Sequence, residues 1–169
     1  MAYLYRWDDK AGELALGITS DGLIETGVKN NAGWTPVGGL YVRMQNKTGS
    51  ASVKGTLVTT GSESMSFVAV TGGVPNCMGI VYDAGVADGS VCRVVVAGIA
   101  QVLFKDGEAP VVGYWCGNSV DTAGRAEAKE SLPDNSGAGV TLHNREIGHI
   151  LETKEAGTDV LARVVLHFN

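Results

Sequence analysis

The three histidines of this 169-residue chain are its strongest candidates for metal ligands, but their spacing matches no ligand motif. His143, His149 and His167 include no H-x-x-x-H pair, and no Cys-x-x-Cys accompanies them. His149 and His167 fall on the two strands expected at the end of the chain, where they could approach one another across a hairpin. Ordinary strand histidines that hydrogen-bond or face solvent are the favoured interpretation. We therefore expect no metal and no other cofactor.

Aspartates are plentiful, but they lie where turns are expected. A catalytic pair of carboxylates would need two of them to converge in a pocket, whereas turn chemistry already explains each one. The chain also lacks a G-x-S-x-G nucleophile elbow and a phosphate-binding P-loop. We expect no catalytic residue and no enzymatic activity. The aspartates concerned are Asp83, Asp88, Asp106, Asp121, Asp134 and Asp159.

Composition and charge exclude several classes of protein. Apolar residues make up 44% of the chain, which predicts a globular fold rather than disorder. The net charge is −5 and the lysines and arginines are scattered singly, so direct nucleic-acid binding is not expected. No apolar run of about 18 residues predicts a membrane span, and no signal peptide is apparent, so we expect the chain to be made and assembled in a cytoplasm. The three cysteines, widely spaced, are expected to be small buried hydrophobes: Cys77, Cys92 and Cys116.

The elements that must position these residues are short strands. Segment 91–104 alternates between an apolar or small residue and a mixed one, with Arg93 and Gln101 on the second face. Segment 160–168 is apolar on both faces, and shorter strands are expected near 51–60, 65–70, 78–82, 111–116 and 147–152. Turn signals separate them, and no amphipathic helix is apparent. The sequence therefore predicts an all-β fold, a compact barrel or sandwich of short strands.

The first 45 residues differ from the rest, because their apolar residues follow neither the helical nor the strand period. We interpret 1–45 as an extended N-terminal arm or lead-in and 46–169 as the β domain. Isolated aromatic residues on such an arm could anchor it on a neighbouring subunit. They could equally complete the local core, and the sequence does not decide between the two. They are Tyr3, Tyr5, Trp7, Trp34 and Tyr41.

An order of short motifs over 46–169 resembles phage capsid cement proteins, also termed head decoration proteins, small β-domains formerly of unknown function. A Gly-Ile strand, an Ala-Gly-rich turn and a Val-rich strand follow one another in 79–104. Gly-Tyr-Trp then stands at 113–115, and Ile-Gly-His-Ile-Leu-Glu at 147–152. An Ala-Gly-Thr-Asp turn at 156–159 and a Val-rich strand at 162–166 complete the order.

The resemblance implies a viral structural protein located on the outer surface of a phage capsid. Such proteins bind the major capsid protein after the shell expands, often as homotrimers, and clamp adjacent subunits. The resemblance implies that the aromatic residues of 1–45 could also contact the capsid. Two alternatives stay open. One is another virion part, such as a head fibre base, a minor capsid protein or a tail-tube subunit. The other is a small β-barrel ligand-binding module or enzyme, which would need a pocket lined by converging polar groups.

Overall fold

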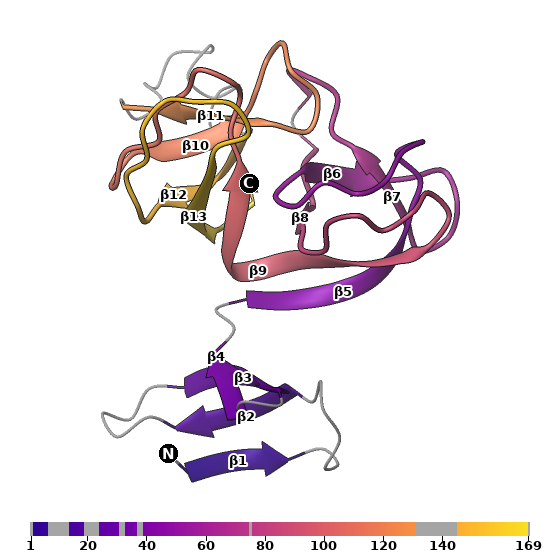
Figure 1. The fold of residues 1–169 in the computed structure, drawn as a ribbon, viewed down its shortest axis with the longest axis vertical. Coiled ribbons are helices and arrows are strands. Elements are labelled where there is room, and N and C mark those ends of the chain that lie inside the picture. Colours follow the sequence, from indigo (N-terminus) through magenta and orange to yellow (C-terminus); the bar gives the residue numbers. More distant parts are fainter. Residues whose placement is uncertain are drawn as a thin grey trace. The chain divides into compact units, whose positions relative to one another are not determined.

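The computed structural model describes residues 2–6, 14–18, 24–30, 33–36, 39–74, 76–130 and 145–168, and these contain strands and no helix (Figure 1). The predicted all-β class is confirmed, and of the two predicted architectures the structure has the barrel: a closed five-stranded barrel with further strands outside it. The chain divides into two compact units, Met1–Leu40 and Tyr41–Asn169. For residues before 40 only the backbone is described.

The first unit is a four-stranded antiparallel sheet. Each strand pairs with the next along the chain, and β1 and β4 form its edges. The sequence predicts an extended arm or lead-in here. Its irregular apolar spacing does not reveal the strands, because they pair through main-chain hydrogen bonds, which do not require a regular apolar pattern. A role for this unit in binding stays a prediction. The strands are β1 (Ala2–Arg6), β2 (Leu14–Ile18), β3 (Ile24–Asn30) and β4 (Gly33–Pro36).

The second unit begins within β5, five residues before the boundary that the sequence suggested. Its barrel has the strand order β9-β5-β7-β6-β8, and an additional pairing between β8 and β9 closes the ring. The β5–β7 pair is parallel, while β6 pairs antiparallel with both β7 and β8. The barrel strands are β5 (Gly39–Asn46), β6 (Leu57–Thr60), β7 (Ser66–Ala69), β8 (Gly79–Val81) and β9 (Val91–Leu103).

The barrel interior is filled by at least one side chain from each of its strands. Phe67 is fully buried and is the largest of them. Because strand side chains alternate between faces, the residues next to these point out of the barrel: Leu57 beside Val58, Ile80 beside Val81. The interior cluster consists of Met44, Val58, Phe67, Val81, Cys92 and Val94.

Four further strands extend from the second half of β9. Strand β13 pairs with residues 98–103 of β9, and β12, β10 and β11 follow in that order. A bridge between Ala126 of β11 and Phe104 brings the last strand back to the end of β9. The sheet is curved as a result, and β9 belongs to both parts of the unit (Figure 1). The strands are β10 (Trp115–Asn118), β11 (Ala126–Lys129), β12 (Glu146–Ile150) and β13 (Leu161–Leu166).

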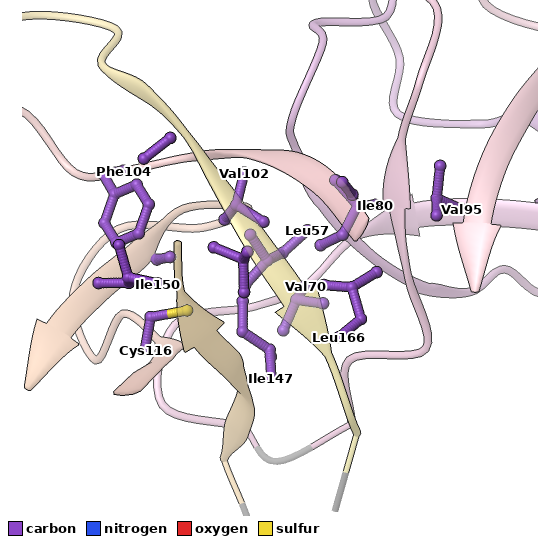
Figure 2. Packing of buried hydrophobic residues seen from close by; sticks show 14 residues of the cluster. Leu57, Val70, Ile80, Val95, Val102, Phe104, Cys116, Ile147, Ile150 and Leu166 are labelled. Atoms are coloured by element: carbon purple, nitrogen blue, oxygen red, sulfur yellow. The ribbon is translucent and has the colours of Figure 1, made fainter. Parts of the chain in front are cut away.

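A second, larger core lies where this curved sheet meets the outside of the barrel (Figure 2). The barrel contributes its outward-facing Leu57, Ile80 and Val95, and the curved sheet contributes residues such as Phe104 and Ile147. Burial of large side chains on both sides fixes the two parts against each other, since each fully buried aliphatic or aromatic side chain stabilises by about 1.5–3 kcal/mol.

The cysteines behave as small hydrophobic residues in these cores. Cys92 lies in the barrel interior, Cys116 is fully buried in the larger core, and Cys77 is half-buried against that core. None of the three is disulfide-bonded. Burial raises the pKa of the Cys116 thiol well above its ordinary value and that of Cys77 to about 12. Such thiols are poor nucleophiles near neutral pH, which agrees with a packing role.

Candidate functional site

An arginine held between two tyrosines lies on the outer surface of the barrel. Cys92 and Val94 point into the barrel, so Arg93 between them points outward. Tyr82 follows the end of β8, and its N–H donates to the carbonyl of Arg93 at 2.9 Å. We call the five residues gathered here the Tyr–Arg patch: Tyr41, Lys54, Tyr82, Asp83 and Arg93.

Arg93 is fixed in a single orientation by ring contacts and hydrogen bonds. Its guanidinium carbon is 4.4 Å from the ring centroid of Tyr82 and 5.7 Å from that of Tyr41. Its Nε donates to both carboxylate oxygens of Asp83 at 3.0 Å, and its Nη2 also donates to Asp83. The backbone N–H of Arg93 donates to the same carboxylate at 2.9 Å. An arginine restrained in this way loses little rotamer freedom when a partner binds.

The electrostatics keep both members of the ion pair charged. The hydrogen bond from Arg93 lowers the pKa of Asp83, although partial burial opposes it, and the same bond raises the pKa of Arg93. Lys54 adds a second cation, with its Nζ 5.3 Å from the Tyr82 ring centroid. The Arg93 side chain remains 37% exposed and Tyr82 38% exposed, so the patch is accessible.

An apolar side chain on β9 enlarges this surface. Val91, which shares the outward face of β9 with Arg93, is 64% exposed. Tyrosine and arginine are the residue types enriched at the centres of protein interfaces, and there they contribute most of the binding energy. The composition of the patch therefore suits a protein partner.

Of the five aromatic residues that the sequence singled out, Tyr41 alone has a described side chain. Its ring is half-buried against the larger core and also lies beside Arg93, so it completes the local packing and contributes to the patch. Tyr3 and Tyr5 lie on β1 and Trp34 on β4, which are the two edge strands of the first sheet. Trp7 lies outside the described residues.

The sequence reasoning missed Tyr82, Asp83 and Arg93 as site residues. A signal was present, because Arg93 is the one charged residue of the alternating segment 91–104. Three of the aspartates that the sequence places in turns form ion pairs with arginines: Asp83, Asp106 and Asp159. Arg125 contacts Asp106 at 2.9 Å and Asp159 at 2.5 Å. These carboxylates are therefore engaged in ion pairs, as Asp83 is with Arg93; Asp134 lies outside the described residues.

A buried glutamate joins β11 to the end of β9. Glu127 accepts hydrogen bonds from Lys129 at 2.7 Å, from Ser119 at 2.9 Å and from Lys105 at 3.0 Å. Burial alone would raise the pKa of Glu127, but these hydrogen bonds outweigh burial and lower the pKa from 4.5 to about 2. The carboxylate is therefore ionised at neutral pH and stabilises the fold.

Glu127→Gln is expected to destabilise the protein at pH 7, with a deficit that shrinks in acid. Because the folded pKa is depressed, stability from ionised Glu127 is present above pH 4.5 and lost as the pH falls toward about 2. Urea denaturation of both proteins at a series of pH values measures this difference. Glu63→Gln, which alters an exposed pair with Lys47, is the control and should cost at most about 1 kcal/mol. A deficit that stays constant across this pH range would contradict the assignment.

The structure brings two of the three histidines together, as the sequence allowed. The ring centroids of His149 and His167 are 4.8 Å apart, and both rings lie beside the carboxylate of Glu146. His143 lies outside the described residues. Glu146 was not a sequence candidate, because simple strand alternation puts it on the opposite face from His149.

Comparisons with known proteins add no functional assignment. The chain matches no family model and no curated protein. Within the described part of the chain, there is no helix long and apolar enough to cross a membrane.

Proposed function

We propose that this chain is a non-enzymatic virion structural protein that decorates the outer surface of a phage capsid and stabilises the shell. Its partners are then the major capsid protein and further copies of itself, in a homotrimer. The observation that supports this most is the Tyr–Arg patch, a restrained cation between two tyrosine rings on the same face as the exposed Val91. The motif order in 46–169 supplies the link to capsid decoration.

The patch has the physical properties of an interface centre. The Asp83 carboxylate and the two rings hold the Arg93 guanidinium in place before any partner arrives, which reduces the entropy lost on binding. The fork of Arg93 donors left facing solvent can reach a carboxylate or carbonyl of the capsid protein. A net charge of −5 fits a protein that contacts the shell rather than the packaged nucleic acid.

The first unit offers a second contact for the same role. Its sheet is open, and β1 and β4 each present one unpaired edge within that sheet. An exposed edge can add a strand from a neighbouring subunit through main-chain hydrogen bonds. Tyr3, Tyr5 and Trp34 lie on these two edge strands. Three linked copies would then combine modest contacts into tight binding by avidity, within a closed symmetric assembly.

Arg93→Ala is expected to weaken binding of the purified chain to expanded empty heads by about 30-fold, which corresponds to the roughly 2 kcal/mol of an interface hot spot. The measurement is co-sedimentation of increasing protein concentrations with the heads, which should saturate for the unmodified chain. Arg93→Lys keeps the charge but loses the planar fork, and should also weaken binding.

Arg163→Ala is the matched control, because Arg163 also pairs with a carboxylate, that of Glu152 at 3.0 Å, but belongs to β13. It should bind like the unmodified chain. Equal binding by a folded Arg93→Ala protein would refute the patch as the contact surface. Binding to unexpanded proheads as strong as to expanded heads would argue against a role after maturation. Rings or tubes formed by the pure protein would favour a different virion part.

A further inference from the structure

A bulge in β12 places Glu146 and His149 on the same face of the strand. On one side β12 pairs with β10, with Cys116 opposite Gly148 and Gly117 opposite Glu146, so Ile147 is an extra residue. Such a bulge reverses the alternation of side chains at one point. Ile147 and Ile150 consequently both reach the larger core, while Glu146 and His149 share the opposite face.

The third member of the cluster comes from the end of β13. His149 is paired with Val165, and the N–H of His167 donates to the carbonyl of Ile147 at 3.0 Å. His167 is two residues beyond Val165 and therefore lies on the face of His149. Two of the three side chains thus come from β12, and the third, that of His167, directly follows the end of the neighbouring β13.

The geometry fits a tetrahedral metal ion. Glu146 Oε1 lies 3.5 Å from His149 Nε2 and 3.4 Å from His167 Nε2. Zinc bonds to nitrogen and oxygen of about 2.0–2.1 Å give ligand-to-ligand distances of roughly 3.3 Å in a tetrahedron. One ligand atom from each residue lies within 4.8 Å of the other two. The histidine side chains are 43% and 40% exposed, so small rotations can bring the two imidazoles into place.

We propose that Glu146, His149 and His167 bind a divalent transition-metal ion of the zinc class, with water in the fourth position. Two imidazoles and a carboxylate favour zinc and its neighbours over calcium or magnesium, which prefer all-oxygen ligands. The ion links β12 to the end of β13 and stabilises the pairing of these two strands. This inference does not depend on the proposed function.

Isothermal titration of the full chain with zinc chloride tests the site. The expected result is one zinc ion per chain, with affinity at least tenfold lower in the double variant His149→Gln/His167→Gln and in Glu146→Gln. Glu152→Gln is the matched control, because Glu152 is a carboxylate close to β12 that pairs with Arg163, and it should bind zinc normally. Both histidines are substantially exposed, so the double variant should fold, and circular dichroism verifies this.

Titration with cobalt chloride identifies the ligands independently of any variant. The expected spectrum has the visible d–d bands of tetrahedral cobalt with nitrogen and oxygen ligands. A thiolate-to-cobalt charge-transfer band would place the ion at a cysteine and overturn the proposal. Unchanged zinc affinity in the folded double variant, or no saturable binding by the unmodified chain, would overturn it equally. In either of those cases the three side chains form a hydrogen-bonded cluster only.

Discussion

Gly148→Ala is expected to lower the free energy of unfolding by on the order of 3 kcal/mol. A β-carbon at position 148 would lie 2.0 Å from the carbonyl oxygen of Val165 and 2.8 Å from Cγ1 of Val164. The first of these atoms is backbone in the paired strand, so it cannot rotate away as a flexible side chain could. The clash can be relieved only if β12 and β13 separate locally. Chemical denaturation followed by circular dichroism measures the resulting loss of stability.

Gly107→Ala is the control for this prediction. Gly148 and Gly107 both have a positive φ, of 157° and 84°, but a β-carbon at position 107 meets nothing within 4 Å. It should cost only the left-handed backbone strain of about 1–2 kcal/mol. Separation of β12 from β13 would also pull His149 away from His167, so the Gly148→Ala protein should bind zinc at least tenfold more weakly. Equal losses of stability in the two variants would contradict the close approach at Gly148.

Phe67→Ala is expected to destabilise the protein by about 3–5 kcal/mol. Phe67 is fully buried and lies in the barrel interior, where it packs with one or more residues from each of the other barrel strands. Removing its ring leaves a cavity that a closed ring of hydrogen-bonded strands cannot easily collapse to fill. A typical domain has about 5–15 kcal/mol of stability, so this single change should consume a large part of it.

Phe168→Ala provides the comparison for Phe67→Ala. Phe168 is only half-buried, at the edge of the larger core, and should cost clearly less than Phe67. Urea denaturation of the three proteins measures both losses. If the two phenylalanine variants were equally stable, Phe67 would not be enclosed by the barrel strands, and the closed pairing of β8 with β9 would be wrong.

The strands with strong alternation could be predicted from the sequence. Segment 91–104 became β9, with Cys92 and Val94 inward and Arg93 outward. The terminal segment 160–168, which is apolar on both faces, was also predicted as a strand and became β13. Period-2 alternation determines which face a residue occupies, and that is enough to place Arg93 on the surface. The expected approach of His149 and His167 followed from the same logic applied to two adjacent strands.

The remaining features depend on pairings that a single sequence does not encode visibly. The parallel β5–β7 pair joins strands that are not consecutive, and the β5–β9 pair joins segments far apart in the chain. Tyr41 and Tyr82 therefore reach Arg93 from two different neighbouring strands, a relation with no signature in sequence spacing. The bulge at Ile147 adds one residue and so reverses the alternation of side chains along β12. Simple alternation therefore placed Glu146 on the wrong face, and the sequence did not identify it as a site residue.

Electron cryo-microscopy of the virion in which we propose that this protein occurs is the decisive test of its role. We expect density for the barrel on the outside of the shell, in groups of three, with Tyr41, Tyr82 and Arg93 against the major capsid protein. Particles without this density, or with Arg93 facing solvent on every bound copy, would contradict it.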